Sequence, residues 1–167
     1  MKEWFALYTV ARKEKVLERE FAKQGTEAYL PMRKELRQWK DRKKLVEVPL
    51  FPSYIFVKTE SNTLYKLVGM TGAVKFIYFE GKPVPVPQHQ IDSIKILLDR
   101  DIKFELQRSN VKVGDRVEIR EGMFAGLTGV IKKEKKTTKF VVAVDALQVS
   151  LIIEVDKKEV LLVNNNK

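Results

Sequence analysis

The chain has 167 residues, 44% of them apolar and 10% aromatic, which is the composition of a globular protein with one or two domains. It contains no cysteine, which excludes a disulfide framework and a thiol nucleophile and fits a reducing compartment. The formal charge of +10 is unevenly placed along the chain, and a basic patch attracts phosphate backbones with little sequence selectivity.

Residues 1–25 predict a strand followed by an amphipathic helix. Residues 3–10 are rich in aromatic and β-branched types, which is typical of a strand. Residues 12–24 carry apolar side chains at helical spacing, and Gly25 follows as a stop. The start of the chain has no apolar leader segment, and no apolar run reaches the roughly 18 residues of a spanning helix. We therefore expect a cytoplasmic protein without membrane contact.

Residues 27–50 predict a hairpin with a basic tip. Residues 33–44 hold seven Lys or Arg against Glu35 and Asp41. Such a cluster attracts phosphate backbones, although a solvated, solubilising loop is an equal alternative. Trp39 could stack on a base or pack under the hairpin, and packing is the commoner use of a single Trp. The candidate nucleic-acid-binding residues of the tip are Arg37, Trp39, Lys40, Arg42, Lys43 and Lys44.

The stretch 49–57 predicts a strand with two apolar faces. Because proline lacks an amide donor, the strand can begin only after Pro52. Alternation then places Tyr54 and Phe56 on one face and Ile55 and Val57 on the other. The aromatic face is either covered by helices of the same domain or open to a helical partner.

The rest of the sequence predicts two helices, followed by a linker and a segment of short strands. Ser61 is a good N-cap for a short helix, and Pro87 begins a longer one. Residues 101–111 read as a linker. Residues 112–164 contain short strands separated by turns, which is typical of a small β-barrel. We therefore predict domains at 1–100 and 112–164.

Catalytic chemistry has few candidates. His89 is the single histidine, and a lone surface role is the better interpretation. Without cysteine there is no soft metal cage, and no phosphate-binding GxxxxGK[ST] loop occurs. We expect neither an enzyme nor a cofactor.

Two motifs carry a family resemblance. Residues 113–119 and 121–131 resemble a KOW motif, the barrel module of NusG-type transcription factors and several ribosomal proteins. Residues 4–8 and 49–57 resemble the NusG amino-terminal (NGN) domain. The resemblance implies an α+β fold: an NGN α/β sandwich with a mainly antiparallel sheet, followed by a small KOW (SH3-like) β-barrel.

Within the family, the chain resembles specialised antitermination paralogues of the RfaH-like or polysaccharide-operon (UpxY-type) sort. The resemblance implies a monomer whose first domain binds the clamp helices of the largest RNA polymerase subunit and reduces pausing or termination. The implied polymerase-binding residues are Ala6, Tyr8, Phe51, Tyr54, Phe56, Ile94 and Leu97.

The resemblance also implies contacts with non-template or upstream DNA and a second partner. The DNA-contacting positions outside the hairpin are Arg12, Arg19, Lys23 and Gln24. Met123 and Phe124 lie in the barrel loop that would meet a small-subunit ribosomal protein or a termination factor, and Phe124 could instead plug the barrel.

Three alternatives remain at this level. The chain could be the general housekeeping NusG, or a KOW-type RNA- or ribosome-binding module that places its barrel lysines on phosphate. The second domain could also be stored as a helical hairpin, as in RfaH. Its glycines and its β-branched run at 140–144 oppose a helix, so we expect a barrel.

Overall fold

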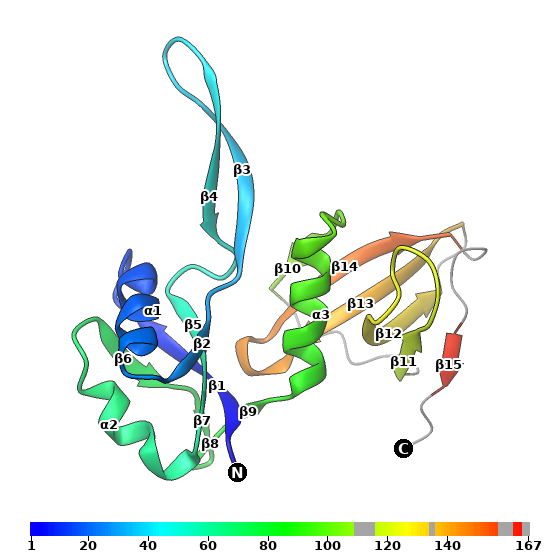
Figure 1. The fold of residues 1–167 in the computed structure, drawn as a ribbon. Coiled ribbons are helices and arrows are strands. Elements are labelled where there is room, and N and C mark those ends of the chain that lie inside the picture. Colours follow the sequence, from blue (N-terminus) through cyan, green and yellow to red (C-terminus); the bar gives the residue numbers. More distant parts are fainter. Residues whose placement is uncertain (109–115, 134–135, 157–161, 165–167) are drawn as a thin grey trace. The chain divides into compact units, whose positions relative to one another are not determined.

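The computed structural model describes residues 1–108, 116–133, 136–156 and 162–164 (Figure 1). Contacts divide the chain into two compact units, Met1–Pro85 and Val86–Lys167. The strand pairs within each unit are antiparallel. The predicted α+β class with mainly antiparallel sheets is therefore confirmed.

The first unit contains a sheet of order β2-β5-β1-β6 and two further hairpins. Its elements are β1 (Glu3–Thr9), α1 (Glu14–Lys23), β2 (Glu27–Tyr29), β3 (Met32–Gln38), β4 (Lys43–Pro49), β5 (Tyr54–Thr59), a 3-10 turn (Ser61–Thr63), α2 (Leu64–Val68), β6 (Ala73–Phe76), β7 (Tyr78–Phe79) and β8 (Lys82–Pro83). The short strand β9 (Pro85–Val86) follows at the boundary between the units.

One face of this sheet packs on helices. Ile55 and Val57 of β5 belong to a buried cluster with Leu17 and Phe21 of α1. The cluster forms because α1 repeats its apolar residues at helical spacing while β1 and β5 alternate theirs. The prediction that Ile55 and Val57 hold the sheet to its helices is confirmed.

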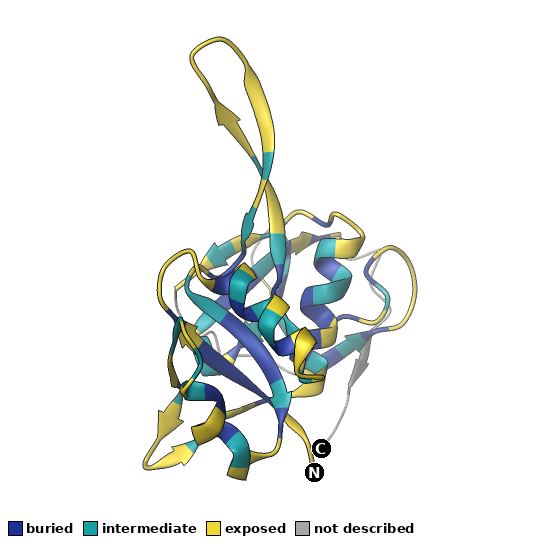
Figure 2. Ribbon diagram, turned by 60° about the vertical axis from the view of Figure 1, so that its left-hand side comes forward, coloured by how far each residue is buried: buried dark blue, intermediate teal, exposed yellow. Residues whose placement is uncertain are grey.

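The β3–β4 hairpin extends away from the first unit's sheet as a two-stranded ribbon (Figures 1 and 2). Its pairing runs from Met32 opposite Pro49 to Gln38 opposite Lys43. Figure 2 shows the outer part of the ribbon as exposed. Its leucines, Leu36 and Leu45, are exposed, so the ribbon is held mainly by its backbone ladder and by cross-strand side-chain pairs.

The second unit joins a helix to an antiparallel sheet of order β10-β14-β13-β12-β11-β15. Its elements are α3 (Gln88–Asp99), β10 (Glu105–Gln107), β11 (Arg116–Ile119), β12 (Thr128–Lys133), β13 (Thr138–Val144), a 3-10 turn (Asp145–Leu147), β14 (Val149–Val155) and β15 (Leu162–Asn164). The described residues after α3 thus form strands rather than a helical hairpin, as their sequence predicts.

The contact-based units differ from the domain boundaries that the sequence suggests. Helix α3, assigned by sequence to the first domain, packs against β12 and β13 of the second unit. Residues 105–107, expected in the linker, form β10, because Leu106 pairs with Leu151 at the edge of the sheet. Residues 109–111 of that linker lie outside the described residues.

Candidate functional site

The aromatic candidates gather on the sheet face of the first unit that is opposite the α1 cluster. Pairing places Ala6 beside Phe56 and Tyr8 beside Tyr54 across β1 and β5. The rings of Tyr8 and Tyr54 are tilted, with centroids 5.4 Å apart. Phe51 meets Phe56 edge to face at 6.0 Å. These five predicted residues therefore form one continuous surface, which we call the aromatic face.

Exposure divides the aromatic face into two parts. Phe56 and Ala6 are fully buried, and Phe51 is nearly so. Tyr8 is 37% exposed and Tyr54 is partly exposed. An exposed aromatic pair beside a buried phenylalanine base is an arrangement that protein partners use, because a rigid ring gains much burial at low entropic cost.

A buried carboxylate fixes the start of β5 and hence the position of Tyr54. The backbone N–H of Ser53 donates to Glu14 Oε1 at 2.9 Å, and Ser53 adopts a left-handed φ of 67°. The Thr9 N–H donates to the Ser53 carbonyl at 2.8 Å. The role of Glu14 was missed by sequence reasoning, since these partners lie 39 residues apart and a carboxylate at the start of a helix has other uses.

The two remaining polymerase-binding candidates lie in the second unit. Ile94 and Leu97 are buried on α3 together with Ile91. Their spacing places them on one stripe of the helix, and α3 packs against β12 and β13. In this structure their apolar side chains belong to the core of the second unit.

The predicted DNA-contacting residues near α1 are all exposed. Arg19 and Lys23 lie one helical turn apart, and Gln24 follows as the C-terminal cap. Lys23 Nζ lies 3.0 Å from Glu20 Oε1, which makes an exposed ion pair. Arg12 precedes the helix with a left-handed φ of 67°. All four side chains can reach a polyanion without rearrangement of the core.

The hairpin tip presents its cations and its indole to solvent. Lys40, Arg42, Lys43 and Lys44 are exposed, as is Arg37. Trp39 is 55% exposed, so the prediction that it packs under the hairpin is wrong. The reason is geometric. The backbone N–H of Trp39 donates to the Arg42 carbonyl at 2.8 Å, so Trp39 lies beside a tight turn with no layer beneath it.

The barrel loop between β11 and β12 contains the two predicted partner-binding residues. Met123 is exposed and Phe124 is buried, which favours the plug role for Phe124. Arg100, at the end of α3, donates through Nη1 to the carbonyls of Met123 at 3.1 Å and Ala125 at 2.7 Å. Arg100 thus holds the loop that presents Met123, a role without a local sequence signal.

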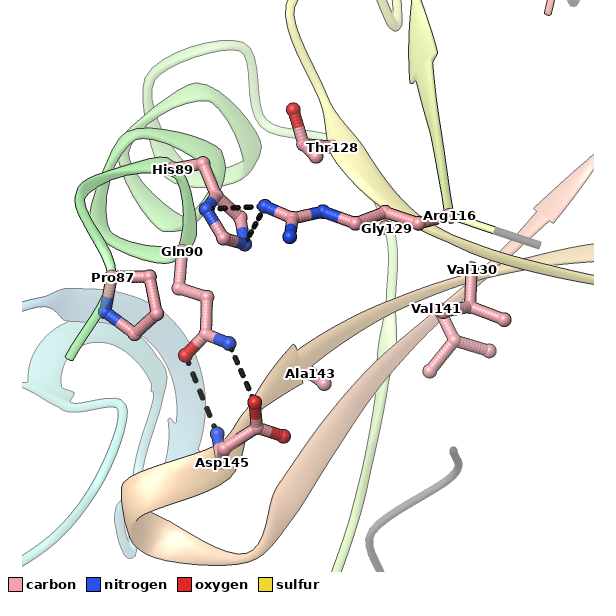
Figure 3. Close-up of a pocket in the computed structure, with 10 residues that line it drawn as sticks. All are labelled: Pro87, His89, Gln90, Arg116, Thr128, Gly129, Val130, Val141, Ala143 and Asp145. Atoms are coloured by element: carbon pink, nitrogen blue, oxygen red, sulfur yellow. Dashed lines mark hydrogen bonds between the residues drawn. The ribbon is translucent and has the colours of Figure 1, made fainter. Parts of the chain in front are cut away.

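Polar side chains on α3 fasten the helix to the sheet. Gln90 Nε2 donates to Asp145 Oδ2 at 3.0 Å, and Gln90 Oε1 accepts from the Asp145 N–H at 3.3 Å (Figure 3). Ser93 Oγ accepts from the Thr128 N–H at 3.1 Å. Gln90 and Ser93 are both buried, so these hydrogen bonds offset the free-energy cost of burying polar groups within an apolar stripe.

A pocket of about 350 Å³ lies beside these contacts (Figure 3). It is lined by Pro87, His89, Gln90, Arg116, Thr128, Gly129, Val130, Val141, Ala143 and Asp145. Its polar side chains bond mainly to one another, which indicates a structural junction between α3 and the sheet.

His89 faces Arg116 across this pocket. Arg116 Nη2 lies 2.6 Å from His89 Nδ1 and 2.7 Å from Nε2, and a guanidinium can only donate. The imidazole must therefore be neutral to accept. Burial lowers the pKa of His89, and the charge of Arg116 lowers it further, whereas Asp145 and Asp92 oppose the shift. His89 is half-buried rather than the plain surface residue that the sequence suggests.

The His89 contact predicts that acid weakens the second unit. Because the folded pKa lies below the unfolded value of 6.5, this stabilisation is complete above about pH 6.5 and is lost as pH falls through the folded value. The chain has one histidine, so its proton NMR ring signals report the titration directly. We expect an apparent pKa below 6.5 in the wild type and a higher one in Arg116→Gln. A wild-type pKa at or above 6.5 would contradict this assignment.

Metal and membrane chemistry have no candidate among the described residues. That part of the chain contains no group of three or more His, Asp or Glu side chains able to hold a metal ion. None of its helices is long and apolar enough to cross a membrane.

Comparison with known proteins adds a family match to this geometry. The family model described as "NusG: Transcription termination factor nusG" matches residues 2–95. The Chlamydia pneumoniae "Transcription termination/antitermination protein NusG" is 28% identical over 110 residues, which are 64% of this chain. The aligned region spans 59% of that relative's length.

Among solved structures, the chain is similar to one reported under "Domain interaction in Thermotoga maritima NusG". The two are 22% identical with a TM-score of 0.49, and the match covers 99% of this chain and 98% of the other.

Proposed function

The chain belongs to the NusG family of transcription factors, which are not enzymes, and from this premise we propose that it is a transcription elongation factor acting as a specialised antiterminator. In this proposal it works in the cytoplasm as a monomer. It binds RNA polymerase through the aromatic face, contacts DNA through its basic elements and presents its barrel to a second partner.

The observation that supports the proposal most is the aromatic face. The tilted rings of Tyr8 and Tyr54 lie side by side on a sheet face that does not belong to the α1 cluster, and both keep solvent exposure. A paired coiled-coil tip such as the clamp helices of the largest polymerase subunit offers the amphipathic helical surface that such a face binds.

The proposed mechanism is a shift of population. Polymerase exchanges between an active form with a closed clamp and paused forms. A factor that binds the closed form more tightly favours elongation by that difference in affinity. Exposed cations on α1 and on the β3–β4 hairpin would hold non-template or upstream DNA beside the bound factor, and their contribution would weaken with salt.

The barrel is proposed to recruit the second partner, a small-subunit ribosomal protein or a termination factor, through the loop at Met123. This loop combines one exposed thioether with a buried Phe124 base, and Arg100 fixes its backbone. Methionine suits such a contact because its flexible side chain adapts to irregular apolar surfaces.

Single-round transcription with purified polymerase tests the proposed activity. Addition of the full chain is expected to shorten pause lifetimes, or to raise terminator read-through, by about fivefold, the lower end of typical coupling energies. An unrelated protein of similar positive charge is the control for non-specific DNA binding. Longer pauses or increased termination would overturn the antitermination assignment.

The runner-up function is a KOW-type RNA-binding module. Lys132 pairs with Lys139 across β12 and β13, and Lys133 lies next to them. Tight binding of naked RNA at physiological salt, together with no capture of polymerase, would favour this alternative. The third possibility is the general housekeeping NusG; a second NusG-like reading frame elsewhere in the genome, with this one leading an operon, would argue for the specialised form instead.

A further inference from the structure

The β3–β4 hairpin has two chemically different faces. In an antiparallel ribbon, directly opposite residues share a face and the face alternates along each strand. Arg37 lies opposite Lys44, and Gln38 opposite Lys43. The backbone N–H of Trp39 donates to the Arg42 carbonyl, which extends the same strand pairing by one step. The ion pair between Glu35 and Arg37 at 3.6 Å fits this alternation.

One face collects the guanidinium groups and the indole. This face, which we call the Arg-Trp face, is made of Arg33, Glu35, Arg37, Trp39, Arg42 and Lys44, with Val46 and Val48 opposite Glu35 and Arg33. The opposite face, which we call the leucine face, is made of Met32, Lys34, Leu36, Gln38, Lys43, Leu45, Glu47 and Pro49. The Arg-Trp face carries four cations against one carboxylate, and the leucine face carries two against one.

The Arg-Trp face has the groups that recognise a nucleic-acid strand. Arg33, Arg37 and Arg42 are exposed, and guanidinium groups match phosphate in a bidentate geometry. Trp39 is exposed at the tip beside Arg42, where a base can stack on the indole. Glu35 is held by Arg37 in an exposed ion pair, which costs little to break.

We propose that the Arg-Trp face binds single-stranded nucleic acid, with an unpaired base stacked on Trp39 and phosphates held by Arg33, Arg37 and Lys44. The inference rests on the proposed function, in which the hairpin contacts DNA, and it specifies both the strand state and the side of the hairpin. A base inside a duplex is already stacked on its neighbours and offers no free face to the indole, so duplex DNA can use the cations alone.

Two double variants test the sidedness with equal loss of charge. Arg37→Gln with Lys44→Gln removes two cations from the Arg-Trp face, and Lys34→Gln with Lys43→Gln removes two from the leucine face. All four side chains are exposed and lie on the same two strands. Binding of the full chain to a fluorescein-labelled single-stranded 15-mer is followed by anisotropy between 50 and 200 mM salt.

We expect the Arg-Trp variant to bind the single strand about tenfold more weakly at 50 mM salt. The magnitude of its slope of log K against log salt is expected to fall by about 1.4, since each lost phosphate contact removes about 0.7 from that slope. The leucine-face variant is expected to change affinity by less than about threefold. Equal losses in the two variants would overturn the sidedness.

Trp39→Ala tests the stacking. It is expected to weaken single-strand binding about tenfold and duplex binding hardly at all, whereas Trp39→Phe keeps most of the affinity. Single-stranded RNA and DNA of one sequence are expected to bind alike, because neither contact uses the 2′-hydroxyl. A preference for duplex, or an unchanged affinity in Trp39→Ala, would overturn the single-strand assignment.

The same variants separate this inference from the proposed function. The anisotropy assay contains no polymerase, so its failure leaves polymerase binding by the aromatic face untouched. If instead the wild type captures no polymerase but binds single strands with the expected sidedness, the proposed function fails and this inference stands.

Discussion

Capture of RNA polymerase by the full chain falls at least about thirtyfold when Tyr8 and Tyr54 are both replaced by alanine, because loss of one interface hot spot costs about 2 kcal/mol or more. The two rings lie side by side across β1 and β5, 5.4 Å apart. They are the exposed part of the aromatic face, so their removal takes contact area from a partner while the α1 cluster stays intact.

The measurement is a titration of tagged chain against purified polymerase core enzyme. The matched control is Tyr65→Ala with Tyr78→Ala, which removes two tyrosines that are 71% and 53% exposed elsewhere in the first unit. It should bind polymerase within about twofold of the wild type, as expected of substitutions outside a hot spot. Equal capture of polymerase by the Tyr8/Tyr54 variant and this control would show that the aromatic face is not the docking surface.

Phe56 is a poorer target for the same test. Its side chain is fully buried, and truncation of a buried phenylalanine costs about 3 to 5 kcal/mol of stability. A Phe56→Ala chain could lose polymerase binding because it unfolds. The tyrosines avoid this ambiguity, and unchanged circular dichroism of their variant would show that the sheet persists.

The sidedness of β5 could be predicted because two local rules agree. Pro52 sets the earliest start of the strand, and period-two alternation then assigns each residue to a face. Tyr54 and Phe56 accordingly lie opposite Ile55 and Val57, and the latter two pack with α1. The same kind of local pattern located the hairpin tip, although it did not predict that Trp39 is exposed there.

The packing of α3 could not be predicted, because it depends on residues far away in sequence. An apolar stripe identifies the buried side of a helix but not the sheet that it covers. Gln90 bonds to Asp145 across 55 residues, and Ser93 to Thr128 across 35. The one available signal was the presence of these two polar residues within the apolar stripe, which indicates that the stripe meets specific polar partners.

The largest stability effect is expected for Gly129→Ala in β12. A Cβ at this position would overlap the Val141 carbonyl oxygen and come within 2.9 Å of the buried Phe140 ring. Backbone cannot yield as a flexible side chain can, and β12 is an interior strand between β11 and β13. We expect a loss of more than about 3 kcal/mol, the upper range for an overpacked core.

Urea unfolding of the full chain and amide hydrogen exchange across β12 and β13 measure this loss. Gly69→Ala is the matched control, since Gly69 has an ordinary φ of −69° and a Cβ at that position would meet only the Lys66 carbonyl, at 3.4 Å. That change should alter stability by less than about 1 kcal/mol. If Gly129→Ala keeps wild-type exchange protection, β12 does not approach β13 this closely, and the pocket beneath α3, which Gly129 also lines, has a different shape.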